Sequence, residues 1–257
     1  MFTVGIDIGS VATKAVLLNQ TEIHRIVYPT GWSPRQAGRQ AYEEVLKRGA
    51  CAPEEIGCVV ATGYGRVSLD FADRSVTEIS CHARGAHYLR PGVSLVIDIG
   101  GQDSKVIRVN GSGRVEDFIM NDKCAAGTGR FLQVMANALG CDVDELGAMI
   151  SDGEPAKINS MCTVFAESEV IGLLAEGVPK ELIVEGLHRS IARRVAAMAA
   201  RMGQPPMVVF TGGVARNQGV CRALEAELGV PVEVPDLCQY TGAIGAALIG
   251  RDKVRST

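Results

Sequence analysis

Two short turns in this sequence combine an aspartate with glycines, and a third turn carries a glycine pair. They read Asp7-Ile8-Gly9-Ser10, Asp98-Ile99-Gly100-Gly101 and Thr211-Gly212-Gly213. Glycines let backbone N–H groups approach phosphate oxygens closely, and a carboxylate at a strand end can hold a hydrated Mg²⁺. One such turn alone is equally consistent with a plain β-turn. Two matched turns plus a third predict a nucleotide site in which Asp7 and Asp98 hold magnesium through water.

The residues beside these turns supply the remaining groups that phosphate chemistry needs. Thr13 and Lys14 add a hydroxyl and a positive charge, and either Gln102 or Asp103 is placed to orient a water against the terminal phosphate. The sequence does not choose between Gln102 and Asp103. Competing nucleotide motifs are absent, because there is no GxxxxGK[ST] loop and no GxGxxG after the first strand.

Two of the eight cysteines lie in segments that precede predicted helices, namely Cys124 and Cys162. A helix N-terminus lowers the pKa of a thiol and favours an anionic ligand. Spacing alone leaves the alternative open that both are buried, inert cysteines. No CxxC pair occurs, so a zinc ribbon or a thioredoxin-type site has no support. The other six cysteines lack such context, and we expect them to be core or surface residues.

The elements that must position these groups occur twice. Residues 4–14 read VGIDIGSVATK and residues 95–105 read LVIDIGGQDSK, identical at five of eleven positions with an offset of 91. Each copy runs strand, acidic turn, strand, strand, which indicates a duplicated α/β domain. Further helices are expected at 35–48, 127–139, 142–150, 166–176, 180–202, 215–228 and 241–250. We place the main domain boundary near residues 91–92, with the last helix returning to the first domain.

Composition narrows the class of protein. The 257 residues are 47% hydrophobic and 21% charged, with a net charge of −3 and no block of like charge, which argues against nucleic acid as a partner. No apolar run approaches the ~18 residues of a membrane span. The first residues resemble a buried strand rather than a signal peptide. We therefore expect a cytoplasmic protein that associates with no membrane.

With these turns in this order, the sequence resembles the actin, sugar-kinase and Hsp70 superfamily of ATPases. The resemblance implies an α/β fold of the duplicated, actin-like (ribonuclease H-like) type, with two domains and an ATP cleft between them. Domain I would cover residues 1–92, together with a C-terminal helix at about 240–257. Domain II would cover residues 93–239 and carry Cys124 and Cys162.

The cysteine segments narrow the resemblance further. KCAAGTGRFL (123–132) and MCTVFAESEV (161–170) are similar to the two cysteine motifs of 2-hydroxyacyl-CoA dehydratase activators, a family that includes the ATP-binding subunits of benzoyl-CoA reductase. GIDIGSVATK, ATGYGR, DIGGQDSK and FTGGVARN match it in the same order. A 4Fe–4S cluster normally takes four thiolates, whereas this chain offers two. The resemblance thus implies a homodimer with one oxygen-sensitive 4Fe–4S cluster, bound by Cys124 and Cys162 of both subunits.

The resemblance also implies an activity typical of anaerobic metabolism. Ferredoxin or flavodoxin would supply an electron, and ATP hydrolysis to ADP with Mg²⁺ would drive its transfer to a 2-hydroxyacyl-CoA dehydratase-like iron–sulfur enzyme. Ser10, Val11, Ala12, Thr13, Lys14 and Gln102 would contact phosphate, and Gly213 and Gln239 the nucleoside. The remaining ATP-binding candidates are Gly9, Gly100, Gly101, Gly127, Thr128, Gly129, Gly212 and Asn217.

Three other functions remain open from the sequence. A small-molecule kinase of the sugar-kinase type would use the same fold, with incidental cysteines. A non-enzymatic ATP switch of the filament-forming type would need no cysteines either. One component of a benzoyl-CoA-reductase-like complex would retain the same motifs. Iron content, phosphorylation of added sugars and nucleotide-dependent sedimentation distinguish these alternatives.

Overall fold

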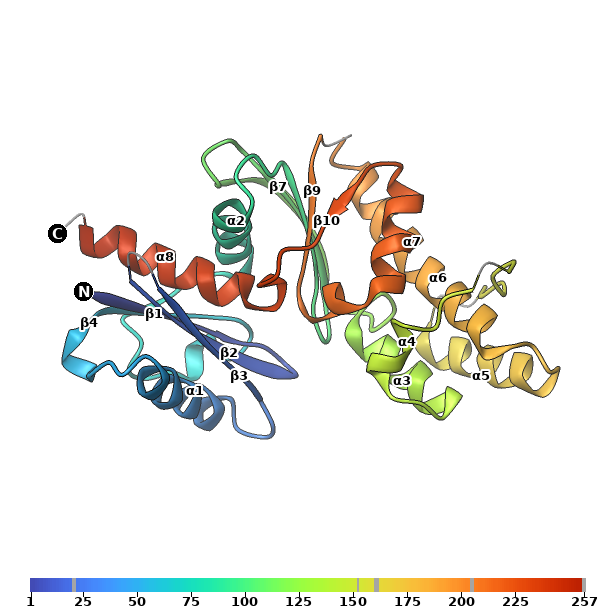
Figure 1. Ribbon diagram of the computed structural model, residues 1–257, viewed down its shortest axis with the longest axis horizontal. Coiled ribbons are helices and arrows are strands. Elements are labelled where there is room, and N and C mark those ends of the chain that lie inside the picture. Colours follow the sequence, from blue (N-terminus) through green and yellow to red (C-terminus); the bar gives the residue numbers. More distant parts are fainter. Residues whose placement is uncertain (20–21, 152, 160–161, 204–205, 256–257) are drawn as a thin grey trace. The chain divides into compact units, whose positions relative to one another are not determined.

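A computed structural model of the chain describes residues 1–19, 22–151, 153–159, 162–203 and 206–255 (Figure 1). Its internal contacts divide the chain into two compact units. Unit 1 comprises Met1–Val96, Ile107–Asp117 and Pro235–Thr257, and unit 2 comprises Ile97–Val106 and Phe118–Val234. The assignment of functional domains to residues 1–92 and 93–239 stays a prediction, and residues 256 and 257 of the predicted returning helix lie outside the described residues.

The first sheet has five strands in the order β3-β2-β1-β4-β5. β1 pairs antiparallel with β2 and parallel with β4, β2 pairs antiparallel with β3, and β4 pairs parallel with β5. The parallel β1–β4 pair places the carboxyl ends of both strands at one edge, where ligands of open α/β sheets bind. The strands are β1 (Phe2–Ile8), β2 (Ala12–Leu18), β3 (Ile23–Pro29), β4 (Ile56–Thr62) and β5 (Arg74–Ser75).

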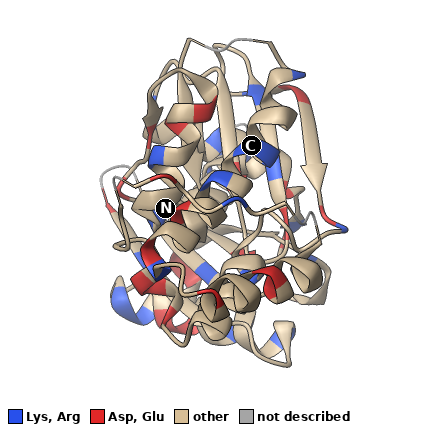
Figure 2. Cartoon of the chain, turned by 90° about the vertical axis from the view of Figure 1, so that its right-hand side faces the viewer, with Lys and Arg blue, Asp and Glu red and all other residues tan. Residues whose placement is uncertain are grey.

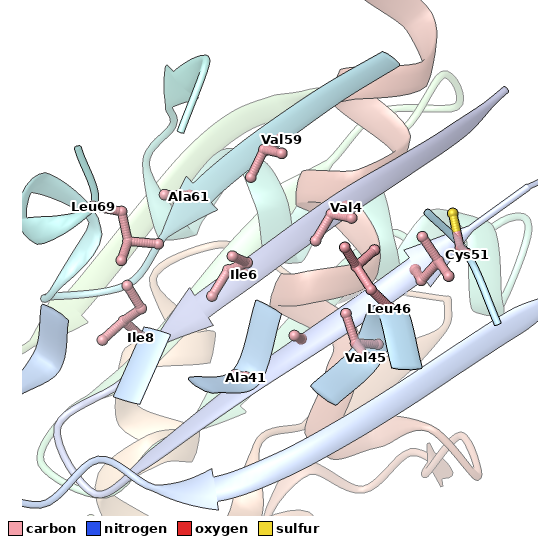
Figure 3. Packing of buried hydrophobic residues seen from close by; sticks show 12 residues of the cluster. Val4, Ile6, Ile8, Ala41, Val45, Leu46, Cys51, Val59, Ala61 and Leu69 are labelled. Carbon is pink, nitrogen blue, oxygen red and sulfur yellow. The ribbon is translucent and has the colours of Figure 1, made fainter. Parts of the chain in front are cut away.

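Helices cover both faces of this sheet. Figure 1 shows α1 (Pro34–Arg48) on one side and α8 (Thr241–Arg255) on the other. The alternation of side chains along a strand explains both layers. Val4, Ile6 and Ile8 of β1 point into the core beneath α1, which Figure 3 shows from close by. On the opposite face of β1, the Thr3 hydroxyl donates to the carbonyl of Ala247 in α8 at 3.0 Å.

Glycines let α8 approach its neighbours at backbone distance. A Cβ at Gly5 of β1 would collide with the carbonyl oxygen of Ala243 in α8. A Cβ at Gly85 of α2 (Glu78–Leu89) would collide with the carbonyl of Thr241, and one at Gly245 with the carbonyl of Cys81. α2, α8 and β1 therefore form a closely packed set in which only glycine fits at these three crossings.

The second sheet also has five strands, in the order β10-β9-β6-β7-β8. β9 and β10 are parallel. The strands are β6 (Leu95–Ile99), β7 (Ser104–Val109), β8 (Val115–Asn121), β9 (Val208–Thr211) and β10 (Val232–Glu233). The helices of unit 2 are α3 (Gly129–Leu139), α4 (Val143–Leu146), α5 (Thr163–Ala175), α6 (Lys180–Ala200) and α7 (Gln218–Leu228). Short 3-10 turns are η1 (Pro53–Glu55), η2 (Arg66–Ser68), η3 (Gly213–Arg216) and η4 (Cys238–Tyr240).

Two helices differ from the sequence-based expectation. The helix expected at 142–150 is only Val143–Leu146, with Gly147 as its C-cap. α2 was not expected at all. Its sequence EISCHARGAHYL contains five strong helix formers, Glu78, Ala83, Arg84, Ala86 and Leu89, and its Gly85 packs against the backbone of α8. Thr77 caps it by accepting a hydrogen bond from the Ser80 N–H.

Charged residues of both signs alternate along the ribbon. In the view of Figure 2, lysines and arginines are interspersed with aspartates and glutamates. This agrees with the absence of charge blocks in the sequence. Among the described residues, no helix has the length and apolar character needed to cross a membrane.

Candidate functional site

The first acidic turn joins β1 to β2, and strand register places its charged groups together. Asp7 lies opposite Lys14 on β2 and Thr62 on β4. Lys14 Nζ lies 3.1 Å from Asp7 Oδ2, and these side chains are 15% and 7% exposed. The turn thus presents a carboxylate–ammonium pair beside the carboxyl ends of two parallel strands.

Thr30, at the end of β3, holds the backbone of this turn. Its hydroxyl donates to the carbonyl of Gly9 at 2.7 Å, and its N–H donates to the carbonyl of Val11 at 2.9 Å. The Thr13 and Thr30 hydroxyls are 3.0 Å apart and both residues are buried. Val11 is 57% exposed at the tip of the turn. The structure therefore presents the backbone of residues 9–12 to solvent and keeps the Thr13 hydroxyl on Thr30.

The second acidic turn contains a buried network. Lys105 Nζ lies 2.6 Å from Asp103 Oδ2 and 3.3 Å from Asp98 Oδ2. The Thr211 hydroxyl donates to Asp98 Oδ1 at 3.0 Å. Side-chain exposure is 2% for Lys105, 3% for Asp98 and 6% for Asp103. Burying one ammonium group with two carboxylates offsets part of their desolvation cost, and removing one partner would leave buried charge uncompensated.

The two candidates for water positioning, Gln102 and Asp103, occupy different environments. Asp103 is buried and ion-paired with Lys105, and its carbonyl accepts a hydrogen bond from the Gly100 N–H at 2.9 Å. Gln102, one residue earlier, is exposed. The Gln102 side chain is therefore open to solvent, whereas the carboxylate of Asp103 is engaged by Lys105.

The third glycine turn contacts the second. Gly212 has φ +91°, a conformation that favours glycine, and a Cβ there would lie 2.8 Å from Asp98 Oδ1. Gly213 follows in η3, and the Asn217 side chain caps α7 by accepting from the Val220 N–H at 2.9 Å. Gln239 lies half-buried in η4 of unit 1. Unit 2 therefore brings together the second and third turns, whereas Gln239 belongs to the other unit.

The segment Gly127–Gly129 leads directly from a cysteine loop to the second turn. The first two N–H groups of α3, on Gly129 and Arg130, donate to the carbonyls of Gly100 and Gly101 at 2.9 and 2.7 Å. Thr128 is the helix N-cap, and its hydroxyl donates to the carbonyl of Ala125 at 2.6 Å. The glycine turn and the start of α3 are thus joined by backbone hydrogen bonds.

Cys124 lies in the loop that enters α3. Asn121 fixes this loop by donating through Nδ2 to the carbonyls of Cys124 and Ala126 at 2.9 and 3.3 Å. Arg194 of α6 donates from Nη2 to Cys124 Sγ at 3.9 Å. A Cβ at Gly127, which has φ +84°, would lie 2.9 Å from Arg194 Cδ. The half-buried thiol of Cys124 therefore has a cationic neighbour, Arg194, whose side chain packs along the loop that contains Cys124.

Cys162 is the N-cap residue of α5, and its side chain is exposed. α5 packs against α3 but buries only Ala166 and Val170. Its other large apolar residues include three exposed ones, namely Val164 at 66%, Phe165 at 68% and Ile171 at 54%. An apolar helix face of this kind beside an exposed thiol is a candidate contact surface.

The other cysteines have environments that favour the neutral thiol. Burial raises the pKa of Cys51, Cys58, Cys141 and Cys221, and it raises the pKa of Cys81 to about 12. Metal ligation needs the thiolate. Cys238 is buried as well.

Cys124 and Cys162 are two thiols, whereas a 4Fe–4S cluster normally takes four thiolates. Over the described ranges, no three or more His, Cys, Asp or Glu side chains are grouped to hold a metal ion. Cys124 and Cys162 belong to one unit, and their loops precede two helices that pack together. Within one chain this donor set is two thiolates short of a 4Fe–4S cluster, and the carboxylates of Asp7 and Asp98 each have a lysine partner.

The sequence did not predict the contacts of four residues that shape these sites: Thr30, Lys105 as a buried partner of two carboxylates, Thr211 with Asp98, and Arg194 with Cys124. The repeat did carry a signal for Lys105, because this lysine matches Lys14 at the end of the duplicated segment. Thr30 and Arg194 reach their partners from 21 and 70 positions away in the chain, so no local pattern predicts them.

Known proteins share this geometry and its motifs. The model of the BadF/BadG/BcrA/BcrD ATPase family matches residues 4–250. One of the benzoyl-CoA reductase chains of Thauera aromatica is 34% identical over 260 residues, covering 96% of this chain and 92% of that protein. The family resemblance derived from the motifs is confirmed.

Two solved structures are similar over nearly the whole chain. One is the activator of the 2-hydroxyisocaproyl-CoA dehydratase from Clostridium difficile with bound ADPNP, with 45% identity, a TM-score of 0.93 and coverage of 100% of this chain and 96% of that one. The other is component A of the Acidaminococcus fermentans (R)-2-hydroxyglutaryl-CoA dehydratase, with 47% identity, a TM-score of 0.95 and coverage of 99% of both chains. The predicted actin-like fold class is confirmed.

Proposed function

Because the chain belongs to the BadF/BadG/BcrA/BcrD ATPase family, we propose that it is an ATP-hydrolysing activator that delivers a low-potential electron to a 2-hydroxyacyl-CoA dehydratase-type enzyme. ATPase activity is a property of the family. The observation that carries the proposal is the pair of hydrogen bonds joining Gly129 and Arg130 to Gly100 and Gly101. They connect a phosphate-type turn to the helix that follows Cys124.

The phosphate groups would be bound mainly by the first turn. Ser10, Val11 and Ala12 offer backbone N–H groups, and Lys14 offers its ammonium group. Thr13 would contribute its backbone, because its hydroxyl is engaged by Thr30. Gly9, Gly100, Gly101 and the segment Gly127–Gly129 would permit close approach, with Gly212, Gly213, Asn217 and Gln239 on the nucleoside side. Asp7 and Asp98 would hold magnesium through water.

Gln102 would position the attacking water. Its side chain is exposed, whereas the carboxylate of Asp103 is committed to Lys105. An amide can accept a hydrogen bond from the water and donate one to a phosphate oxygen. Asp103 would then shape the turn through its carbonyl bond with Gly100.

The nucleotide would influence the cysteines through α3. A shift of Gly100 or Gly101 on phosphate binding moves the acceptors of the first α3 N–H groups, and Cys124 lies five positions before Gly129. Such coupling requires that ATP and ADP bind the two arrangements with different affinity. Differential contact of Gln102 with the terminal phosphate supplies that difference.

Cys124 and Cys162 would bind one 4Fe–4S cluster together with the same two residues of a second chain, in a homodimer. A cluster of this type supplies one-electron chemistry at low potential. The exposed apolar face of α5, formed by Val164, Phe165 and Ile171, supports an isologous contact beside Cys162. A two-fold interface would bury this face and bring four thiols together.

Ferredoxin or flavodoxin would be the electron donor. A hollow of about 540 Å³ lies between the segment 154–159 and α6. One acidic side chain, Glu154, lines it, together with the basic side chains of Lys157, Arg189, Arg193 and Arg194. A donor with an acidic face would be guided to this hollow by charge complementarity.

The test combines iron analysis with a variant of the hydrolytic turn. Anaerobically purified protein should contain about two irons and two acid-labile sulfides per chain, and Gln102→Ala should slow ATP hydrolysis without changing iron content. Gln133→Ala, on the surface of α3, is the matched control. Absence of iron even after reconstitution would overturn the redox proposal and favour a kinase of the same superfamily.

A second candidate is one component of a benzoyl-CoA-reductase-like complex. The 34% identity with the Thauera reductase chain supports it. The two candidates differ in assembly. A free activator purifies as a homodimer that activates an added dehydratase, whereas a reductase component co-purifies with other chains in fixed stoichiometry.

A further inference from the structure

The duplication extends beyond the acidic turns to a second pair of glycine turns. β4 ends in Thr62-Gly63 and β9 ends in Thr211-Gly212. Gly63 has φ +87° and Gly212 has φ +91°. A Cβ at Gly63 would lie 2.7 Å from Asp7 Oδ1, and a Cβ at Gly212 would lie 2.8 Å from Asp98 Oδ1. Each unit thus contains the same arrangement of an aspartate, a threonine–glycine turn and a lysine.

The two copies differ in how tightly the aspartate is held. In unit 1, Lys14 binds Asp7 and stays partly exposed, and the buried Thr62 hydroxyl makes no hydrogen bond to this aspartate. In unit 2, Lys105 binds Asp98 Oδ2 and the Thr211 hydroxyl binds Asp98 Oδ1. Both oxygens of Asp98 are therefore engaged by groups from two other strands, whereas the first copy lacks the threonine contact.

Lys105 has a further partner that the first copy does not offer. Position 103 is an aspartate, and the matching position in the first copy is Ala12. Both residues accept a backbone bond that closes their turn, from Gly9 to Ala12 at 3.1 Å and from Gly100 to Asp103 at 2.9 Å. Only in the second copy does the lysine also hold the side chain of that residue.

We infer that Lys105 and Thr211 are positioning residues that fix Asp98 and the Gly100–Asp103 turn in the geometry that receives magnesium and phosphate. Thr211 fixes the position of one carboxylate oxygen of Asp98. Lys105 fixes the other oxygen and, through its ion pair with Asp103, the turn. The orientation of Asp98 toward a magnesium-bound water is then determined before nucleotide binds. In unit 1 the equivalent Lys14 has one carboxylate partner instead of two, and its side chain is 15% exposed. The inference rests on the nucleotide site proposed above.

The test uses the full-length chain and the near-isosteric variant Thr211→Val. Losing one hydrogen bond to a charged group weakens an equilibrium by about tenfold. We expect the Mg²⁺ concentration for half-maximal ADP binding to rise by about that factor, while Mg²⁺-free ADP binding is unchanged. The Gly100 N–H should exchange with solvent deuterium about tenfold faster. Thr211→Ser should restore both values, because it restores the hydroxyl.

Thr62→Val is the matched control, since Thr62 occupies the same place in unit 1 without a bond to its aspartate. It should change neither the magnesium dependence nor Gly100 exchange. Lys105→Met is a second, more severe variant with the same expected direction. The inference is overturned if Thr211→Val behaves as wild type in both measurements, or if Thr62→Val produces the same changes. If the wild-type chain shows no magnesium-dependent nucleotide binding, the proposed function fails, and Gly100 exchange alone decides the positioning roles.

Discussion

Arg194 Nη2 lies 3.9 Å from Cys124 Sγ, although the two residues are 70 positions apart in the chain. The arginine side chain reaches the sulfur by packing along Gly127, the residue where a Cβ would collide with it. Hydrogen bonds to cluster sulfurs are among the factors that set reduction potentials. The proposed cluster would thus have one cationic donor from α6 in each chain.

Replacing Arg194 should make the proposed cluster harder to reduce. Arg194→Gln removes a positive charge beside a thiolate ligand, so the reduction potential should shift to more negative values. A redox titration followed by electron paramagnetic resonance measures this shift. Arg193→Gln is the control, because Arg193 is exposed and pairs with Glu227 instead. An unchanged potential in Arg194→Gln would contradict a role for this contact.

A charge on the exposed face of α5 should weaken the proposed homodimer. Val164→Glu places a carboxylate on a face that the dimer would bury, and burying an unpaired charge is costly. Sedimentation velocity should show monomers where the wild type shows dimers, with less iron retained per chain. Val67→Glu alters a valine that is 82% exposed in unit 1, and it should leave the dimer intact. Dimers of undiminished stability in Val164→Glu would exclude this face as the interface.

The glycines at which α8 packs closely on β1 and α2, namely Gly5, Gly85 and Gly245, should not tolerate larger side chains. Gly85→Val would press two methyl groups against the backbone of Thr241, and overpacking of this kind costs about 1–3 kcal/mol. For a protein of this size, the Tm should fall by roughly 5 °C. Differential scanning fluorimetry measures the change. Gly111→Ala, which has open space around its Cα, should change the Tm little, and equal Tm values for both variants would argue against the crossing.

His188 should make the fold sensitive to acid. It is fully buried in α6, and neither ring nitrogen has a hydrogen-bond partner among the described residues. Burial, and secondarily the charge of Arg222, lowers its pKa from 6.5 to about 4. Between pH 6.5 and about 4, His188 is therefore protonated in the unfolded chain and neutral in the folded chain. Stability is complete above pH 6.5 and falls as the pH drops toward 4, by about 3 kcal/mol.

His188→Leu should remove this contribution. The variant has a non-titrating side chain of similar size, so its free energy of unfolding should depend less on pH between 6.5 and 4. Urea denaturation at several pH values measures the difference. His24→Leu, at a partly exposed position of β3, is the control and should keep the wild-type pH dependence. A parallel pH profile for His188→Leu and wild type would contradict the assignment.

The sequence was sufficient to predict the elements that repeat. Buried runs ending in Asp-Ile-Gly predicted β1 and β6, and the repeated order of strand, acidic turn, strand, strand predicted the strands that follow. Turns bearing glycine at positive φ, such as Gly212, were recognisable because few other residues adopt that backbone conformation.

Features set by packing between distant segments were not predictable. The contact of α2 with α8, more than 150 positions later in the chain, is one such feature. The partnership of Thr211 with Asp98 spans 113 positions. The threonine–glycine turns lie outside the duplicated segments 4–14 and 95–105, so the repeat itself does not reveal this contact. The sequence alone did not show that Asp103 is buried and Gln102 exposed, because their burial depends on distant segments.

The position of α8 has a consequence for synthesis on the ribosome. This helix covers a face of β1, and the Thr3 hydroxyl bonds to Ala247, 244 positions away. The first strands to be translated therefore keep one apolar face open until almost the entire chain has been made. Residues 118–234 are contiguous and contain most of unit 2. They can therefore fold before α8 is available to pack on the N-terminal strands. Nascent chains should accordingly offer the β1–β2 face to chaperones late in translation, and deletion of 241–255 should make that exposure permanent.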